Sequence, residues 1–351
     1  MPACIVNNVR VLGISSVVPS EEFDLRDEKN LYDGDQRRIE RIISSSGFLK
    51  RRVSPLNVMT SDLCYEAAEN VILNTKISRD KIDGLIFISY TPDYLMPATS
   101  YVLHKRLGLS KNCIVVDIPQ ACSGYEIGLY QASMMINYGC KNVLLLVGDS
   151  FSKFSDMFNN SSAPIFSDAG TATILTYDKF SRNTYINIFS NGEGYSSLMC
   201  KNGGFKNIPT RDMFYDNGLF KYESSMDGGK IFDFALYEVS NGINSILEFS
   251  KIDKSEIDYF VMHQANKLIL KTIATQIGVS EDKIPMKTIT EYGNQCGASI
   301  PCTISNELFL DIISKNNKLL LSGFGVGLSW ANVIIDMNQI YCSGIIEYEG
   351  K

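Results

Sequence analysis

Three side chains in this sequence, a thiol, an imidazole and an amide, could together carry out acyl transfer. Cys122 stands between the apolar run Ile114–Ile118 and a stretch beginning at Tyr125 with apolar residues at helical spacing. This order predicts a strand, a tight turn and a helix, with Cys122 at or just before the helix N-terminus. The unpaired N–H groups and the dipole there favour a thiolate. The alternative is an inert core cysteine, because free cysteine often fills hydrophobic cores.

The imidazole is that of His263, one of only two histidines in the chain. It follows the apolar strand Tyr259–Met262, at the strand end where open α/β sheets place their sites. A structural histidine is the alternative interpretation. The other histidine, His104, lies inside a predicted helix and is expected to face solvent or to pack structurally.

The amide is that of Asn294, in a turn of small residues; its alternative role is that of an ordinary turn residue. Together with His263 it offers two neutral donors to one carbonyl oxygen, which is what an enolate formed by decarboxylation requires. Alternating glycines at 323, 325 and 327 follow another apolar strand. Such glycines let the backbone approach a ligand and free an N–H group for an oxyanion.

Composition limits the class of protein. With 351 residues and 45% hydrophobic residues, the chain fits a globular protein of two compact units, without a membrane span. The start of the chain lacks the features of a secretory signal. A net charge of −6 gives no support to nucleic-acid binding. The nine cysteines contain no Cys-x-x-Cys pair, so we expect neither disulfides nor a metal site, and a cytoplasmic location.

Strands that alternate with helices along the chain predict α/β layers with a mostly parallel sheet. Three segments recur, in the same order, about half a chain later: 81–87 at 256–262, 106–110 at 276–280, and 142–148 at 317–323. We therefore predict two similar halves packed as one body, residues 1–180 with the nucleophile and residues 181–351 with the histidine and asparagine.

Two further stretches have open interpretations. The segment 190–229 is rich in glycine, asparagine and aromatic residues, and is either a substrate lid or a surface insertion. The basic cluster Lys50-Arg51-Arg52 is expected to be a solvated surface run.

Four motifs stand out along the chain: Ala121-Cys122-Ser123-Gly124, His263-Gln264-Ala265-Asn266, Gly293-Asn294 with Ala298-Ser299-Ile300-Pro301, and Gly323-Phe324-Gly325-Val326-Gly327. Together they resemble one enzyme family, β-ketoacyl-acyl-carrier-protein synthase III of the thiolase superfamily. The resemblance covers nearly the whole chain. It implies a duplicated five-layer α-β-α-β-α fold, a homodimer, an acyl carrier protein as partner, and thioester substrates without a metal or other cofactor.

The resemblance also implies a mechanism. Cys122 accepts an acyl group from a thioester, and malonyl on an acyl carrier protein then loses carbon dioxide. His263 and Asn294 stabilise the resulting enolate, which attacks the acyl group on Cys122. The N–H groups of Cys122 and Val326 form the oxyanion hole. Substrate-binding roles fall to the following residues: Met96, Phe232, Asn266, Gly325 and Gly327.

The acyl donor and the acceptor are less constrained. Relatives that use coenzyme A carry a tryptophan and an arginine that clasp its adenine, whereas this chain has Arg41 and Ser45 there and its only tryptophan is Trp330. A carrier protein could therefore replace coenzyme A as donor. One alternative function is acyl transfer from Cys122 to an amine or hydroxyl, with His263 as general base. A third possible function is that of a non-catalytic carrier-binding protein, but the presence of Cys122, His263 and Asn294 argues against it.

Overall fold

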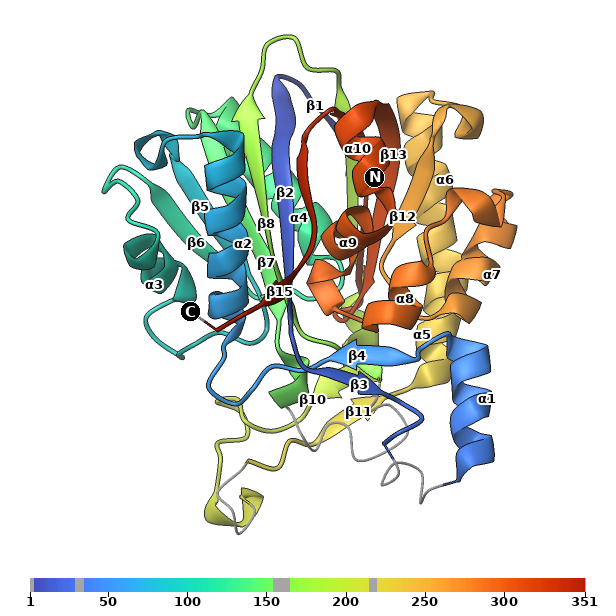
Figure 1. The fold of residues 1–351 in the computed structure, drawn as a ribbon. Helices are drawn as coiled ribbons and strands as arrows, with labels where there is room; N and C mark the ends of the chain where they lie inside the picture. The colour runs from blue at the N-terminus through green and yellow to red at the C-terminus, as the bar shows by residue number, and fades with distance from the viewer. Residues whose placement is uncertain (1–2, 29–34, 154–164, 215–219, 351) are drawn as a thin grey trace.

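Two large β-sheets lie face to face, with helices between them and on both outer faces (Figure 1). This arrangement is seen in a computed structural model that describes residues 3–28, 35–153, 165–214 and 220–350. The predicted five-layer α-β-α-β-α fold is confirmed.

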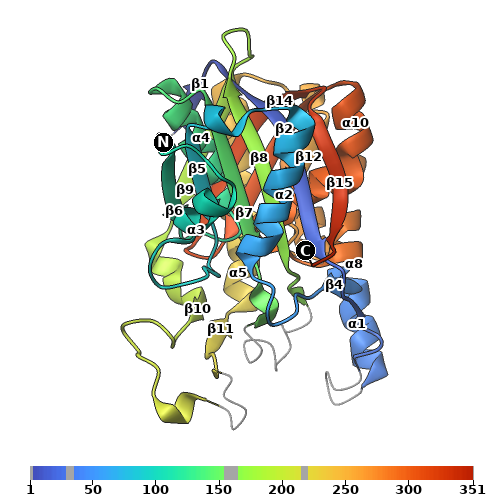
Figure 2. The ribbon, with the colours of Figure 1, turned by 60° about the vertical axis from the view of Figure 1, so that its left-hand side comes forward.

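The first sheet has six strands and carries most of the N-terminal half of the chain. Its strands lie in the following order: β15 (Tyr341–Tyr348), β2 (Val9–Pro19), β8 (Ala169–Tyr177), β7 (Asn142–Asp149), β5 (Gly84–Ile88) and β6 (Ile114–Ile118). Strand β6 forms the edge of this sheet, and its first residue, Ile114, is 58% exposed. The C-terminal strand β15 lies at the opposite edge, beside β2 (Figure 2).

The second sheet has five strands, in the order β1 (Ala3–Val6), β9 (Thr184–Ser190), β14 (Ser329–Asn338), β13 (Asn316–Gly325) and β12 (Tyr259–Met262). It repeats the pairing of the first sheet. β12 runs parallel to β13 as β5 does to β7, and β13 runs antiparallel to β14 as β7 does to β8. Two of the sequence repeats therefore form equivalent strands. The boundary between residues 180 and 181 stays a prediction.

The prediction of a mostly parallel sheet is wrong. Both sheets are mixed, and the pairs β2–β8, β7–β8, β1–β9, β9–β14 and β13–β14 are antiparallel. The pair β13–β14 shows the reason, since only residues 326–328 connect the two strands. A parallel pair needs a long crossover, whereas so short a connection returns the chain in the opposite direction.

Helices cover both faces of each sheet, and three large hydrophobic clusters lie between the layers. The central cluster joins α4 (Gly124–Asn137) and α9 (Ser299–Thr303) to the facing sides of both sheets. One outer cluster packs α2 (Thr60–Thr75) and α3 (Thr99–Arg106) on the first sheet, and the other packs α6 (Ser240–Ser250) and α7 (Lys267–Ile277) on the second. In β5, Ile86 and Ile88 face the central cluster, whereas Leu85 and Phe87 face the outer cluster. Because both faces of this strand are buried, its sequence is apolar throughout.

The remaining elements lie mainly around one end of the sheets, drawn at the bottom of Figure 1. They include α1 (Gln36–Ser46), α5 (Gly228–Phe234), α8 (Lys287–Tyr292), the pair β3 (Glu22–Asp24) and β4 (Lys50–Arg52), and the pair β10 (Leu198–Cys200) and β11 (Ser224–Met226). Helix α10 (Phe309–Ser314) follows α9 through a π-helical turn. The segment 190–229 thus contains a two-stranded pair, and its residues 215–219 lie outside the described residues.

The basic cluster at residues 50–52 is not a fully solvated run. Arg52 is buried, with salt bridges to Glu22 and Glu347, and Arg51 pairs with Glu28 at 2.6 Å. The cluster forms β4, which pairs with β3, and the partners lie far from it in sequence. Local charge density gave no sign of these contacts.

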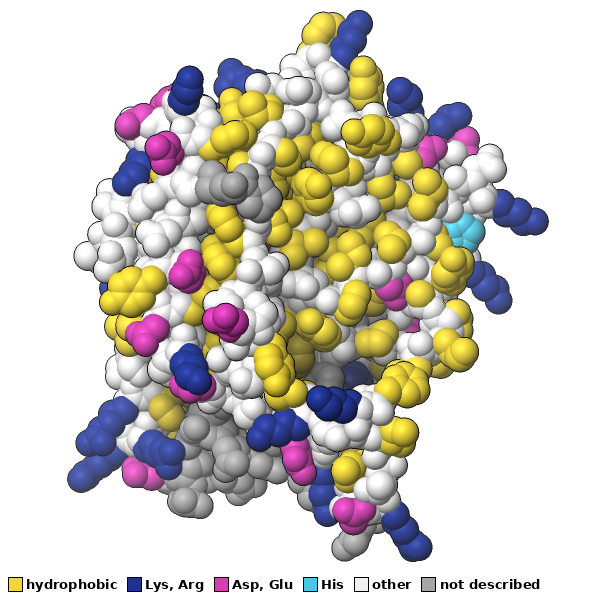
Figure 3. Space-filling model, turned by 180° about the vertical axis from the view of Figure 1, so that it is seen from behind, with side chains coloured by type: hydrophobic (Ala, Val, Ile, Leu, Met, Phe, Trp, Pro, Cys, Tyr) yellow, Lys and Arg dark blue, Asp and Glu magenta, His cyan; other side chains and the backbone are white. Residues whose placement is uncertain are grey.

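The face opposite to the view of Figure 1 carries many hydrophobic side chains (Figure 3). The described residues with large, exposed hydrophobic side chains include three neighbours before α3, namely Tyr94, Leu95 and Met96. In the part of the chain that the structure describes, no helix is both long enough and apolar enough to span a membrane.

Candidate active site

Cys122 lies at the start of α4, in the turn that follows β6, as predicted. The Gly124 N–H closes this turn by donating to the Ala121 carbonyl at 2.7 Å. The Ser123 hydroxyl lies 2.7 Å from that of Ser329, which ties the turn to β14 of the second sheet. Cys122 is 8% exposed, so its sulfur lies at a helix N-terminus with little solvent around it.

His263 lies directly after β12, and three contacts fix it. Its N–H donates to the Ser322 carbonyl of β13 at 2.9 Å. Its ring Nδ1 lies 2.8 Å from the Ser299 hydroxyl, and the ring meets Phe324 edge to face at 5.5 Å. With Nδ1 engaged by Ser299, Nε2 is the ring nitrogen left to hydrogen-bond Cys122, a contact that the structure contains.

The surroundings of the Cys122 sulfur lower the pKa of its thiol well below the ordinary value. The largest cause is a hydrogen bond from the Cys296 thiol, and the charge of His263 and hydrogen bonds from the imidazole and from the Val326 N–H add to it. Burial opposes these effects. The lowered pKa favours the thiolate, the nucleophilic form of cysteine.

Asn294 lies between α8 and α9, and its backbone is bound to a neighbouring segment. Its N–H donates to the Ile165 carbonyl at 2.8 Å, and its carbonyl accepts from the Ser167 N–H at 2.9 Å. Its side-chain Oδ1 accepts from the Cys296 N–H at 2.8 Å. With the oxygen held in this way, the amide presents its NH2 group as a donor.

The glycine turn between β13 and β14 touches Cys122 directly. A Cβ atom on Gly325 would lie 2.8 Å from both Cβ and Sγ of Cys122, closer than real Cβ atoms approach. Only glycine therefore lets this strand end pass so close to Cys122. This close approach lets the N–H group of the next residue, Val326, hydrogen-bond the Cys122 sulfur.

Three residues of this site were not predicted from the sequence. Cys296 lies two positions after Asn294, and a second thiol among small residues was the available signal. Glu126 lies one helical turn after Cys122, fully buried, and neither carboxyl oxygen has a hydrogen-bond partner among the described residues. Burial, together with the charge of Cys122, raises the pKa of Glu126 to about 8.

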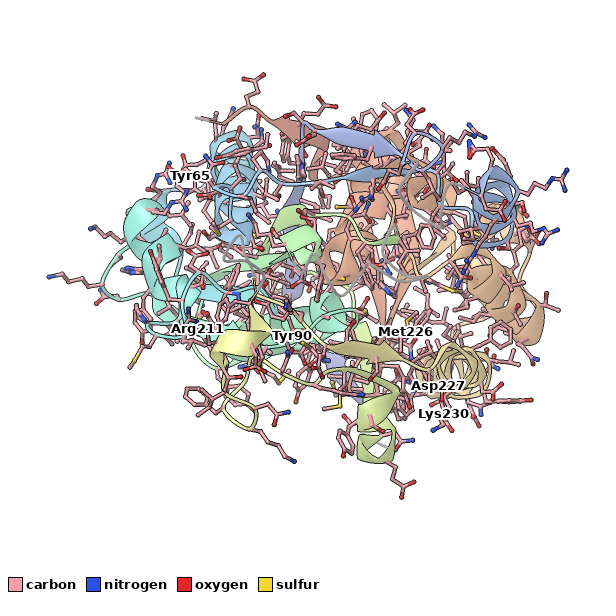
Figure 4. The ribbon with its side chains drawn as sticks, turned by 90° about the horizontal axis from the view of Figure 1, so that it is seen from below. Tyr65, Tyr90, Arg211, Met226, Asp227 and Lys230 are labelled. Carbon is pink, nitrogen blue, oxygen red and sulfur yellow. The ribbon has the colours of Figure 1, made fainter. Side chains whose placement is uncertain are left out.

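The third residue is Tyr90, which follows β5. Burial and, second, the charge of Cys122 raise the pKa of its phenol, so the ring lies within electrostatic range of the sulfur. Tyr90 is nevertheless 40% exposed. Viewed from below, it lies near the centre of the molecule, with Met226 and Asp227 to its right (Figure 4).

The structure places the other predicted residues as follows. Met96 is 80% exposed, and Phe232 packs from α5 against the outer cluster that contains Phe324. Asn266 caps α7, where its side chain accepts from the Ile269 N–H at 2.8 Å. Gly327, in the glycine turn, has a φ of 139°. Their substrate-binding roles stay predictions.

His104 has a structural contact, since its Nε2 lies 2.9 Å from the Ser110 carbonyl oxygen. Among the described residues, no three side chains of histidine, cysteine, aspartate or glutamate are grouped so that they could hold a metal ion.

Comparison with known proteins gives a consistent result. The family description 3-oxoacyl-[acyl-carrier-protein (ACP)] synthase III matches residues 116–193, and that of its C-terminal part matches residues 247–337. A putative 3-oxoacyl-[acyl-carrier-protein] synthase 3 of Campylobacter jejuni is 31% identical over 97% of this chain and 98% of its own. The chain belongs to the β-ketoacyl-[acyl-carrier-protein] synthase III family. The predicted resemblance is confirmed.

Other members of this family agree. A β-ketoacyl-[acyl-carrier-protein] synthase III of Streptococcus agalactiae is 34% identical over 84% of this chain and 89% of its own. The crystal structure of a 3-oxoacyl-(acyl-carrier protein) synthase from Burkholderia xenovorans superposes with a TM-score of 0.91, at 33% identity and 99% coverage of both chains. The protein is thus a ketoacyl synthase III-like condensing enzyme, which transfers acyl groups. These relatives do not favour the amine or hydroxyl acyltransferase.

Proposed function

We propose that the protein loads an acyl group from a thioester onto Cys122 and condenses it with malonyl carried by an acyl carrier protein. The observation that carries this proposal is the environment of the Cys122 sulfur, which receives hydrogen bonds from His263 and from the Val326 N–H at a helix N-terminus. Such a thiolate is the attacking species in acyl transfer.

In the first step, the Cys122 thiolate attacks the thioester carbonyl and forms a tetrahedral oxyanion. The N–H groups of Cys122 and Val326 hold this oxygen, and the thiol of the donor leaves. Donors fixed in advance at the developing charge need no reorganisation during the reaction. The tight passage of Gly325 past Cys122 supports this role for Val326.

In the second step, the malonyl thioester carbonyl accepts hydrogen bonds from His263 Nε2 and the Asn294 amide. Carbon dioxide leaves, the electron pair forms an enolate on that oxygen, and its carbon attacks the acyl group on Cys122. The β-ketoacyl product and the Cys122 thiolate are released. The contacts of His263 with Ser299 and of Asn294 with the Cys296 N–H orient both donors, which supports this assignment.

An acyl carrier protein, rather than coenzyme A, is the proposed acyl donor. Trp330 is 7% exposed and stacks on Phe189 at 5.1 Å, so it does not present its ring to an adenine. The positions of the clasping residues, Arg41 and Ser45, lie exposed on α1.

The proposed docking surface for the carrier is the basic side of α1, which carries Arg37 and Arg41, with Glu40 beside them. Helix α1 projects from the same end of the molecule as Tyr90 (Figures 1 and 4). Cationic side chains there would hold the phosphate of the carrier's phosphopantetheine arm. Lys267 packs against α1, because its side chain lies directly against Gly47 at the C-terminal end of this helix.

A homodimer is proposed as the working form. Strand β6 is an edge strand, and an unpaired edge offers backbone groups to a second copy of the chain. The exposed side chains of Leu95 and Met96 and the hydrophobic face in Figure 3 add apolar area. The cytoplasm is the proposed location, in accord with nine free cysteines.

Intact-protein mass spectrometry tests the proposed function. The protein is incubated first with acetyl-coenzyme A, then with acyl-carrier thioesters, and finally with the malonyl carrier. We expect an adduct on Cys122 from the carrier thioester that turns over into a β-ketoacyl product. An adduct that also forms on the Cys122→Ala variant, or one that malonyl carrier leaves in place while an amine or alcohol removes it, would contradict the proposal.

A further inference from the structure

The candidate active site contains two thiols, and only one of them has a role in condensation. Cys122 and Cys296 are 8% and 1% exposed, and the Cys296 thiol hydrogen-bonds the Cys122 sulfur. The residues beside them also lie close together, since a Cβ on Gly297 would lie 2.7 Å from the Ala121 carbonyl oxygen. The turn that contains Cys296 therefore packs against the turn that contains Cys122.

The backbone of Cys296 is held in an unusual conformation. Its φ of 50° lies in the left-handed region, which residues other than glycine rarely occupy. One neighbour fixes this turn, because Asn294 Oδ1 accepts from the Cys296 N–H at 2.8 Å. Conformations of this kind persist where the surroundings enforce them, and they gather at functional sites.

The two thiols differ in chemical character. Hydrogen bonds and charge lower the pKa of Cys122, whereas burial, and then the hydrogen bond to Cys122, raise the pKa of Cys296. The pKa values of the two thiols are thus shifted in opposite directions. Cys64 and Cys302 do not offer this combination, because burial raises the pKa of both, that of Cys302 to about 12. A low-pKa cysteine beside a second cysteine is the arrangement found in reversible thiol oxidation.

We propose that Cys122 and Cys296 form a reversible disulfide when the protein meets a peroxide. The Cys122 thiolate attacks one peroxide oxygen, the O–O bond breaks, and hydroxide leaves with the second oxygen. Cys122 then carries a sulfenic acid. The sulfur of Cys296 attacks the sulfenic sulfur, and the hydroxide that leaves takes up the Cys296 proton as water. The two cysteines lose two electrons and the peroxide gains them.

This disulfide would have two consequences for the enzyme. It occupies the sulfur that accepts the acyl group, so loading stops. It also consumes the sulfenic acid before further peroxide converts it to a sulfinic acid, an oxidation state that thiols do not reverse. An acyl group on Cys122 removes the thiolate, so acyl-loaded enzyme should resist peroxide.

The test exposes the full chain to hydrogen peroxide, alkylates the remaining thiols and maps the peptides by mass spectrometry. We expect a peptide pair joined through Cys122 and Cys296 that disappears on reduction with dithiothreitol. The readout needs no substrate, so it is independent of the proposed function and its failure is distinguishable from a failure of condensation. Wild-type Cys122 found as a sulfinic acid beside a free Cys296 thiol would overturn the proposal.

Two serine variants sharpen the result. In Cys296→Ser, we expect Cys122 to proceed to the sulfinic acid, with a several-fold smaller recovery of free Cys122 on reduction. Cys302→Ser is the matched control, because Cys302 is also buried and lies six positions further along the chain. It should retain the disulfide. Equal recovery of free Cys122 in the wild type and in Cys296→Ser would also overturn the proposal.

Discussion

The Ser299 hydroxyl lies 2.8 Å from Nδ1 of His263 and so determines which way the imidazole points. Ser299 begins α9, whereas His263 follows β12, so the contact joins two elements of the C-terminal half. This contact leaves the second ring nitrogen, Nε2, to face Cys122. A histidine that polarises a carbonyl must be held in one orientation, and a partner on the second ring nitrogen is the usual means.

The first prediction concerns this contact. Ser299→Ala should lower the rate of malonyl decarboxylation by roughly tenfold, within the contribution of a positioned proton donor. Acyl loading of Cys122 should fall less, because the Val326 N–H and Cys296 remain. Both rates are measured by single-turnover mass spectrometry. Ser305→Ala is the control, since this buried serine lies 2.8 Å from the Ser16 hydroxyl instead. Equal losses in the two steps would contradict the assigned role.

The second prediction uses Gly325. A Cβ at this position would approach Cys122 Cβ and Sγ to 2.8 Å, so Gly325→Ala must displace the turn and with it the Val326 N–H. Loss of an oxyanion donor typically lowers the rate by about 100-fold. We expect a loss of that order in acyl-enzyme formation. Gly192→Ala is the matched control, because nothing lies within 4 Å of its added Cβ. A Gly325→Ala variant that loads normally would exclude the proposed oxyanion hole.

The third prediction concerns the pH dependence of stability. Burial raises the pKa of Glu126 from 4.5 to about 8. Between these values the folded protein keeps a proton that the unfolded chain releases, so the free energy of unfolding contributed by this group falls as the pH rises. Glu126→Gln removes the titration. Relative to that of the variant, the free energy of unfolding of the wild type should fall by a few kcal/mol between about pH 5 and about pH 8.

Urea unfolding at several pH values measures this difference. The exposed Glu248, changed to glutamine, is the control and should follow the wild type. Parallel curves for the wild type and Glu126→Gln would show that Glu126 is ionised in the folded protein throughout this range.

The residues of the candidate site could be predicted because they follow strands or occupy glycine-rich turns. The run before Cys122 and the run before His263 each formed the expected strand. The equivalence of β5 with β12 followed from repeated segments, whereas the five layers were implied by the family resemblance. These features depend on local pattern, which a single sequence contains.

The contacts that tune the site could not be predicted in this way. Cys296 reaches Cys122 only because its backbone is left-handed and because the two halves of the chain pack together. Glu126 shares a helix with Cys122, but its burial depends on β13, where a Cβ on Gly323 would collide with its carboxylate. The buried Arg52 likewise depends on partners at Glu22 and Glu347. Each of these is a contact between segments distant in sequence.

The fourth prediction tests the basic side of α1. The double change Arg37→Glu with Arg41→Glu should raise KM for a carrier-protein thioester by about tenfold, with kcat nearly unchanged. The effect should shrink at high salt. A small synthetic thioester, which makes no contact with α1, should react as with the wild type. Lys179→Glu, in the loop between β8 and β9 at the other end of the molecule, is the control (Figure 1).

The fifth prediction concerns the proposed homodimer. Ile114 begins the edge strand β6 and is 58% exposed in the single chain. If a second copy covers this edge, Ile114→Asp places a charge in an apolar contact and costs several kcal/mol unless the interface opens. Light scattering coupled to size exclusion should then report a lower mass for the variant than for the wild type.

Leu73→Asp provides the control for this measurement, because Leu73 is 75% exposed on α2, in the outer helix layer of the first sheet. It should keep the mass of the wild type. Met96 gives a second readout, since a partner subunit over the loop before α3 would protect it from oxidation in the wild type and not in the dissociated variant. A wild-type protein that elutes with the mass of one chain would exclude the homodimer.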